Sequence, residues 1–445
     1  MKRISILALF AIVLTSCSSL ASSISSEDSS SFLRSSFSIE SSSSIIDSSS
    51  QSEVSKESEI ISSSSSVSSS IESSSSSEIS SSSSSLSSSS ENRPPVNKNI
   101  FLTEINTGTS YMNRAVEISN IGEEDASLDN YSLCVYRNWD ETPTEKIPLD
   151  GYVIKAKSCF VIAYNLAKQE IKDKADLLSD KYLNDGTFPV SLNYYDEVVD
   201  SIGHIGYIYD FAKAAVLVRL KEYFKQKKAF DEFEWIRYPV DSLSTLGNYD
   251  VVDQETLLEG PKLSEEFFNK PYCDNATNGN GGVMEVTYQY NIDGDTTKFN
   301  FGYDYDKYDI SGSMSMRYYG INTPEIAHGA GEEPDPYGDE AKEFTTRMLN
   351  GAKHYLVQSV CDYSLHETYG RMLGYVWISN KSNPELSDYT LLNFLIIKNG
   401  FSRPGFIDRQ ASYNSLMAYE GVSYVEYLYY ANTYAEKLGL NIHSK

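Results

Sequence analysis

Five charged residues between positions 293 and 371 have side-chain types that could hydrolyse a phosphate ester. Three are carboxylates and two are guanidiniums, namely Asp293, Asp295, Glu325, Arg317 and Arg371. Such hydrolysis needs an activated water, cations on the phosphate oxygens and usually a metal ion. Arginine suits the phosphate because its planar fork can bind two oxygens at once. Any one of these residues alone would be taken for a surface charge beside a turn, so their order and spacing matter most.

These residues fall in three of four short motifs that follow one another in a characteristic order. The motifs are IDGDT at 292–296, RYYGINTPE at 317–325, PYGDEA at 336–341 and ETYGR at 367–371. In this succession, residues 282–443 resemble the staphylococcal thermonuclease family. The resemblance implies a five-stranded β-barrel of the OB type with packed helices. It also implies calcium-assisted hydrolysis of DNA and RNA with little sequence specificity.

The resemblance assigns a role to each matching position of the catalytic set. Arg317 and Arg371 correspond to the arginines that bind the phosphate. Glu325 corresponds to the proposed general base, which must lie within hydrogen-bond reach of the attacking water. Tyr369, two residues before Arg371, is the tyrosine best placed to contact the substrate.

The resemblance likewise implies a calcium site, with one departure from the family pattern. Asp295 corresponds to a calcium ligand, and Thr323 would contribute its backbone carbonyl oxygen. Asn322 stands where the family usually has a second aspartate. An amide oxygen can still coordinate calcium but brings no charge, so we expect weaker cation binding. The loop 329–335 is acidic, where the staphylococcal enzyme has lysines.

Strand and helix patterns supply the elements that must position these residues. Strands are expected at 283–291, 355–360 and 371–378. A helix is expected to start at Asp335-Pro336, with Asp as its cap, and to end at Gly351. Two more helices are expected, one at 386–398 and one from the capping box of Ser423 and Glu426 to Gly439. Strands and helices in this order are consistent with the barrel.

Residues 98–250 read as a separate domain of short strands. AVEISN at 115–120 alternates apolar and polar residues, which predicts a half-buried strand. Strands at regular spacing between turn signals predict a β-sandwich. Its strings FLTEI, AVEISN and LDNYSL resemble a lamin-tail domain, which implies an immunoglobulin-like fold. No catalytic set is visible in it, so a spacer and a binding module remain alternatives.

The chain starts with features of a lipoprotein signal. Lys2 and Arg3 precede an apolar run that is too short to cross a bilayer, and Leu14-Thr15-Ser16-Cys17 resembles a bacterial lipobox. We therefore expect a signal peptide at 1–17, with lipid on Cys17 anchoring the protein to the extracellular face of the cell membrane. A serine-rich segment at 18–97 is expected to be a disordered linker. A second linker is expected at 251–281.

Composition limits how the protein can bind a polyanion. The net charge is −25, so counterion release can contribute little to nucleic-acid binding, and long-range attraction to DNA should be poor. No histidine lies at metal-ligand spacing from another histidine or a cysteine, which disfavours zinc. Cys134 and Cys159 are expected on neighbouring strands, where they could form a disulfide; the pairing of Cys273 and Cys361 stays open.

The sequence as a whole predicts a surface-anchored, calcium-dependent endonuclease acting on extracellular DNA and RNA. The alternative is a non-catalytic surface module that binds nucleic acid or a cell-surface ligand. The presence of Glu325 with both arginines favours the enzyme, because a binding module has no need of a general base.

Overall fold

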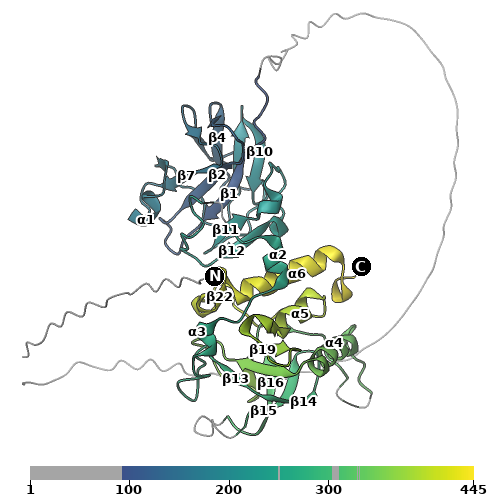
Figure 1. The fold of residues 1–445 in the computed structure, drawn as a ribbon. Coiled ribbons are helices and arrows are strands. Elements are labelled where there is room, and N and C mark those ends of the chain that lie inside the picture. Colours follow the sequence, from purple (N-terminus) through teal and green to yellow (C-terminus); the bar gives the residue numbers. More distant parts are fainter. Residues whose placement is uncertain (1–92, 249–250, 303–309, 328, 330, 445) are drawn as a thin grey trace, which may run out of the picture. The chain divides into compact units, whose positions relative to one another are not determined.

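Two sheets in residues 100–238 face each other across an apolar core in the computed structural model of the chain (Figure 1). The structure describes residues 93–248, 251–302, 310–327, 329 and 331–444. The predicted signal peptide, the lipid site at Cys17 and most of the predicted serine-rich linker lie outside these residues. The described part of the chain is mostly β, with several antiparallel sheets and some helices.

The first of these sheets has six strands in the order β12-β11-β1-β2-β7-β8, and the second has four in the order β10-β9-β4-β5. Neighbours pair antiparallel except for β7 and β8. The strands are β1 Ile100–Asn106, β2 Ala115–Asn120, β4 Tyr131–Val135, β5 Glu145–Pro148, β7 Ser158–Tyr164, β8 Leu177–Ser179, β9 Val190–Tyr194, β10 Glu197–Ile202, β11 Val216–Arg219 and β12 Trp235–Tyr238. A small pair, β3 Ala126–Ser127 with β6 Val153–Ile154, accompanies them.

Strand β2 is buried on both faces, so the expectation of a half-buried strand is wrong. Val116 and Ile118 face the core between the two sheets. Ala115 faces the other way, into a smaller cluster that also includes Ile171 of helix α1 Gln169–Lys172 and Leu246. The alternation correctly predicts two different faces of the strand. Helix α1 and the segment 243–248 cover the polar face, and the pattern within one strand cannot show this.

The expected neighbourhood of Cys134 and Cys159 is also wrong. Cys134 lies on β4 and Cys159 on β7, and these strands belong to different sheets. Both side chains are thiols. The thiol of Cys134 is near the Ser132 hydroxyl, and the thiol of Cys159 is near the Ser119 hydroxyl.

A third sheet, in residues 283–391, closes on itself. Its order is β13-β18-β19-β16-β15-β14, with β20 paired to β19. The two end strands are consecutive in the chain and only Val286 separates them, so the two edges of the sheet meet. The strands are β13 Val283–Glu285, β14 Thr287–Asn291, β15 Thr296–Asn300, β16 Ser313–Tyr318, β18 His354–Gln358, β19 Met372–Ser379 and β20 Thr390–Leu391. All pairs are antiparallel except β16 with β19.

Helices pack against this closed sheet, and Figure 1 shows α5 between α6 and β19. The helices are α2 Gln254–Glu259, α3 Glu265–Phe268, α4 Gly338–Gly351, α5 Leu392–Lys398 and α6 Tyr424–Leu438. Short 3₁₀ turns lie at η1 Lys221–Tyr223, η2 Glu232–Glu234, η4 Leu386–Asp388, η5 Ser412–Leu416 and η6 Asn441–His443. Four short strands form two further pairs, β17 Ile321–Asn322 with β21 Arg403–Pro404, and β22 Ala418–Tyr419 with β23 Val422–Ser423.

The last helix was predicted most accurately. The Ser423 side chain accepts a hydrogen bond from the backbone N–H of Glu426, and Gly439 ends the helix in the left-handed conformation. The Glu426 carboxylate binds Arg409 instead of closing the reciprocal half of the capping box. Helix α5 is shorter than expected, because residues 386–391 form a 3₁₀ turn and strand β20 before it.

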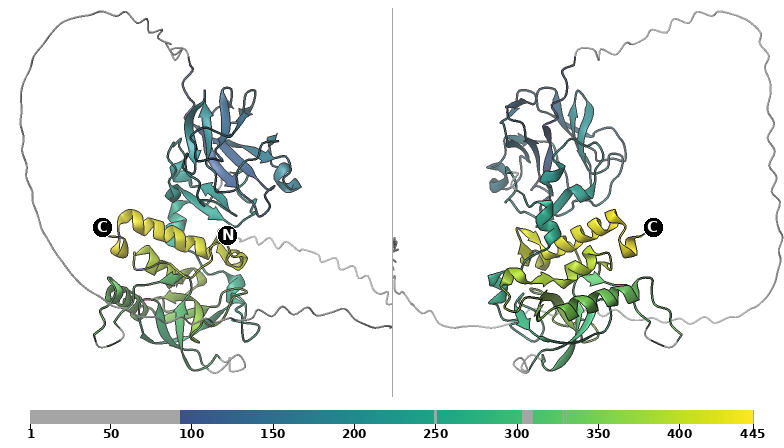
Figure 2. Two further views of the ribbon diagram at one scale, coloured as in Figure 1. Left: turned by 180° about the vertical axis from the view of Figure 1, so that it is seen from behind. Right: turned by 45° about the vertical axis from the view of Figure 1, so that its right-hand side comes forward.

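Residues 251–281 add buried side chains to the core of the closed sheet. Leu257 of α2 and Phe267 of α3 belong to the same apolar cluster as Phe394 and Trp377. None of the helices in the described ranges is long and apolar enough to cross a membrane. Figure 2 shows the helices and sheets from two further directions.

Candidate active site

Three adjacent strands of the closed sheet bring the predicted residues together. Asp295 comes directly before β15, Arg317 lies near the end of β16, and Arg371 comes directly before β19. Thr296 pairs with Arg317 across β15 and β16, and Arg317 pairs with Leu373 across β16 and β19. This register explains how residues far apart in the sequence meet at one end of the three strands.

These residues line a cavity of about 790 Å³. Its lining includes Asp295, Arg317, Asn322, Glu325, Tyr369 and Arg371, together with Asp293. A neighbouring hollow of about 620 Å³ shares Asn322 and Glu325 with the cavity and also touches Thr323. All the residues predicted for catalysis and for the metal therefore lie in or beside one continuous recess.

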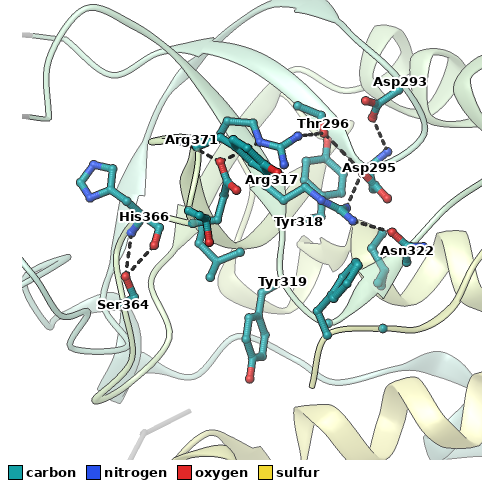
Figure 3. Close-up of a pocket in the computed structure, with 18 of the residues that line it drawn as sticks. Asp293, Asp295, Thr296, Arg317, Tyr318, Tyr319, Asn322, Ser364, His366 and Arg371 are labelled. Atoms are coloured by element: carbon teal, nitrogen blue, oxygen red, sulfur yellow. Dashed lines mark hydrogen bonds and ion pairs between the residues drawn. The ribbon is translucent and has the colours of Figure 1, made fainter. Parts of the chain in front are cut away.

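Arg317 is the buried centre of the cavity. Its guanidinium forms an ion pair with the Asp295 carboxylate, and its Nη2 donates to Asn322 Oδ1 at 2.8 Å (Figure 3). Arg317 and Asp295 are 8% and 4% exposed, so the pair is largely shielded from water. Burial raises the pKa of Asp295, the nearby Asp293 raises it further, and Arg317 opposes both effects.

The other oxygen of Asp295 fixes the segment that carries Asn322. Asp295 Oδ2 accepts from the Thr323 backbone N–H at 2.7 Å and from the Thr323 hydroxyl at 3.0 Å. Gly294 makes this approach possible, because a Cβ there would lie 2.5 Å from Thr323 Oγ1. The Asp295 carboxylate thus connects the start of β15 with Arg317 of β16 and with the turn after β17.

The structure holds Glu325 through its backbone and leaves its side chain exposed. The Glu325 N–H donates to Asp335 Oδ2 at 3.2 Å, and the Asp335 N–H donates to the Glu325 carbonyl at 2.9 Å. Gly338 packs close beside them, since a Cβ there would lie 2.3 Å from the Glu325 carbonyl oxygen. Asp335 is therefore not the cap of α4, as the sequence had suggested. Tyr337, in the left-handed conformation, precedes the helix instead.

Arg371 is the more accessible of the two arginines. Its Nε donates to Glu367 Oε1 at 3.0 Å, and its Nη1 donates to the Thr296 hydroxyl at 3.4 Å. Burial alone would raise the pKa of Glu367, but the guanidinium and the backbone N–H groups of Tyr369 and Arg371 hold it below its usual value. Glu367 leaves the remaining nitrogens of Arg371 able to bind an anion in the cavity.

Two exposed aromatic rings border the cavity. Tyr369 is 85% exposed and Phe406 is 81% exposed. The Arg317 guanidinium lies 5.9 Å from the centre of the Phe406 ring. Exposed rings beside cationic groups can stack on nucleobases. Tyr369 was predicted from its place beside Arg371, whereas nothing in the sequence pattern marks Phe406.

Sequence analysis missed three residues that support this site, namely Glu367, Asp335 and Phe406. The spacing of four between Glu367 and Arg371 was a usable signal for an ion pair. Asp335 gave a misleading signal, because Asp before Pro usually marks a helix start. Each of these residues acts through a loop, and loop conformations have no periodicity that a pattern could reveal.

The oxygen donors at the centre of the cavity suit a hard divalent cation. Asp293 and Asp295 supply carboxylate oxygens, and Asn322 supplies an amide oxygen. Asp295 Oδ2 already accepts two hydrogen bonds from Thr323, and Asp295 Oδ1 pairs with Arg317 and accepts from the Thr296 hydroxyl, so a cation would compete with these donors. No group of three or more His, Cys, Asp or Glu side chains in metal-binding arrangement occurs in the part of the chain that the structure describes. A cation here would thus depend on few charged ligands.

A closed sheet with a polar cavity holding two arginines and several carboxylates is the kind of site that phosphodiester-cleaving proteins use. Consistent with this, residues 315–426 match the family of staphylococcal nuclease homologues. The matched residues include Arg317, Glu325 and Arg371, and this part of the chain is a nuclease-like domain. The match begins after Asp295 and covers a minority of the chain. No curated protein matches the sequence.

A pH-dependent contribution to stability should come from Glu367. Its pKa is lowered in the folded protein, so it stabilises the fold above the pKa of the unfolded state, about 4.3. This contribution is lost as the pH falls through the lower folded value. Glu367→Gln should therefore reduce the free energy of unfolding by about 1 kcal/mol at pH 7 and by little near pH 2.

Urea unfolding of both proteins at these two pH values measures the difference. Glu343→Gln, a change of an exposed carboxylate in the middle of α4, is the matched control and should have little effect at either pH. An equal loss of stability in Glu367→Gln at both pH values would show that the charge of Glu367 is not what matters.

Proposed function

We propose that residues 282–443 form an OB-fold nuclease domain that hydrolyses the phosphodiester bonds of DNA and RNA. The observation that carries the proposal is the convergence of Arg317, Arg371, Asp295 and Glu325 on one cavity of about 790 Å³. The closed sheet and the similarity of residues 315–426 to staphylococcal nuclease homologues support it. Contacts to the phosphate backbone imply little sequence specificity.

The two arginines have different tasks in this proposal. Arg371 is about one-third exposed and reaches the cavity from its edge, so it can capture a phosphate from solvent. Arg317 is buried and held by Asp295 and Asn322, so it offers a preorganised donor to the charge that develops on the phosphate oxygens. Preorganised donors in a partly dry site stabilise a transition state without further rearrangement.

Glu325 would act as the general base. Its side chain is exposed at the junction of the cavity and the neighbouring hollow, where a water can approach the phosphate. The carboxylate takes a proton from this water as the water oxygen bonds to phosphorus, while the P–O bond to the leaving sugar oxygen breaks and that oxygen takes a proton from solvent. Asp335 and Gly338 fix the backbone of Glu325, so the carboxylate swings only about its own side-chain bonds.

We propose calcium as the cofactor, held by Asp295, Asn322 and Thr323, with Asp293 nearby. When bound, calcium would add positive charge beside the phosphate oxygens. Thr323 presents its N–H and hydroxyl to Asp295, so its backbone carbonyl is the atom left for the ion.

We further propose that residues 98–250 are a lamin-tail-like, immunoglobulin-like sandwich and that lipid on Cys17 anchors the chain outside the cell membrane. Two facing sheets with a shared core support the first point. The second rests on the sequence alone.

Replacing the general base should abolish most activity. Glu325→Gln keeps the shape of the side chain but cannot accept the proton, and loss of a general base typically lowers the rate about 10²- to 10⁴-fold. Degradation of plasmid DNA and of RNA with calcium, and with chelator, measures it. Glu333→Gln, in the acidic loop 329–335, is the matched control and should retain activity. Full activity of a folded Glu325→Gln protein would show that Glu325 is not the general base, whereas a wild type that degrades neither DNA nor RNA would leave the binding-module alternative.

Adding a carboxylate should strengthen the calcium site. In Asn322→Asp a second charged ligand faces the cation, and calcium affinity depends on the number of charged ligands. The new carboxylate will also pair more strongly with Arg317, which competes with the cation. We expect the cation to win because a divalent ion carries the larger charge. A calcium titration of activity should show half-saturation at a lower concentration in the mutant. An unchanged or higher value would place Asn322 outside the metal site.

Lipid attachment is tested separately from catalysis. Cells that express the chain, grown with a radioactive fatty acid, should label the wild-type protein and not Cys17→Ser. The wild type should sediment with membranes because two acyl chains anchor stably. A Cys17→Ser protein that is still labelled and still sediments would contradict the lipobox interpretation.

A further inference from the structure

A group of buried oxygens in the first pair of sheets, far along the sequence from the candidate active site, lacks hydrogen-bond donors. Glu104 of β1 and Glu117 of β2 are direct partners across the two strands, and each is only 1% exposed. Thr245, 3% exposed, lies in the segment 243–248 that covers this face. Carboxylates are rarely buried without a compensating cation or hydrogen bonds.

A register shift in β1 explains why so many polar groups meet here. The pairing of β1 with β2 shifts between Leu102 and Glu104, so Thr103 has no partner in the ladder. The Thr103 hydroxyl donates to Glu117 Oε1 at 2.6 Å and also lies 2.8 Å from the Ser119 hydroxyl. Thr103 and Glu104 thus both reach the side of the sheet where Glu117 and Ser119 point.

The two glutamates differ in how their oxygens are occupied. Glu117 accepts from Thr103 and, through Oε2, from the backbone N–H of Gly247 at 2.6 Å. Within the described residues, neither oxygen of Glu104 has a hydrogen-bond partner, and neither does Thr245 Oγ1. Thr245 nevertheless lies close enough to Glu104 to influence its pKa. The Glu104 carboxylate and the Thr245 hydroxyl therefore lie beside each other, with Glu117 opposite Glu104 across the strands.

The nearest basic group, Lys174, does not form an ion pair that neutralises the Glu104 carboxylate. Lys174 is the cation that acts on Glu104, but its ammonium group donates to the Leu246 carbonyl oxygen at 2.7 Å. Burial, and secondarily Glu117, raises the pKa of Glu104. A single proton shared by the two carboxylates would satisfy one oxygen of Glu104 and leave the Thr245 hydroxyl as the only nearby donor for the other oxygen. A metal ion can contact all three oxygens at once.

We propose that Glu104, Glu117 and Thr245 bind one hard divalent cation, with calcium as its best representative. All three offer oxygen, which hard cations prefer, and two carboxylates neutralise two positive charges. The thiol of Cys159 is near Ser119, but burial raises its pKa, so it stays protonated and a softer metal gains no thiolate. The cation would tie the segment 243–248 to the sheet, alongside the bonds of Gly247 and Lys174.

Equilibrium dialysis of the purified full-length chain with radioactive calcium tests the proposal. We expect two bound equivalents in the wild type, one in Glu104→Gln and one in Asp295→Asn, which lacks the proposed active-site ligand. Glu124→Gln, which changes an exposed carboxylate in the loop between β2 and β3, is the matched control and should bind two. If the proposed nuclease site takes no calcium, the wild type will bind one equivalent, and Glu104→Gln alone will lose it.

Two further measurements keep the test decisive if Glu104→Gln folds poorly. Thr245→Val removes only the hydroxyl and should weaken calcium binding at this site at least several-fold. Calcium should raise the unfolding temperature of Asp295→Asn by several degrees and should not raise that of the double variant Asp295→Asn with Thr245→Val to the same extent. Nuclease activity should be unchanged in Thr245→Val.

The alternative is that Glu104 and Glu117 share a proton and bind no metal ion. In that case Asp295→Asn binds no calcium, and stability falls as the pH rises from about 4.5, because the pKa of Glu104 is higher in the folded than in the unfolded state. Glu104→Gln would then remove this pH dependence. Such a result would overturn the cation proposal, as would equal calcium binding by Asp295→Asn with and without Glu104→Gln.

Discussion

The ion pair between Arg317 and Asp295 is the constraint on which the candidate active site depends. Asp295 uses one oxygen for the guanidinium and the other for Thr323, so a single carboxylate sets the positions of the arginine and of the turn that carries Asn322. The pair is nearly dry, and breaking a buried pair by removing one partner leaves an uncompensated charge. Replacing Arg317 would therefore disturb the packing of the cavity as well as its charge, whereas Arg371, held mainly by Glu367, can be replaced with less effect on the fold.

The two arginines give a short-range attraction for an anion in a recess that also holds the carboxylates Asp293, Asp295, Glu325 and Glu367. A net charge of −25 repels a polyanion at long range, yet two arginines within one recess act at short distance, where screening matters less. Exposed rings at Tyr369 and Phe406 add contacts that do not depend on charge. Such a protein is expected to bind nucleic acid slowly and to select strands whose bases can reach the rings.

Sequence patterns predicted the elements whose signals are local or periodic. The final helix was recognisable because Ser423 and Gly439 mark its ends, and the motifs around Arg317 and Arg371 predicted residues that the fold brings together. Patterns failed where distant segments decide the outcome. The polar face of β2 is buried because α1 and residues 243–248 cover it, and Asp335 turns back to Glu325 instead of capping α4. The placement of Cys134 and Cys159 in different sheets likewise depends on topology, which spacing along the chain does not encode.

The closure of the third sheet has a consequence for synthesis of the chain. Strands β13 and β14 emerge first and are consecutive, but β13 finds its partner only when β18, some seventy residues later, has been made. Until then β14, β15 and β16 can form a meander with an open edge on β16, whose parallel partner β19 comes later still. Open edges invite pairing with other chains. The nascent protein therefore passes through an aggregation-prone interval that ends only when β19 enters the sheet between β16 and β18.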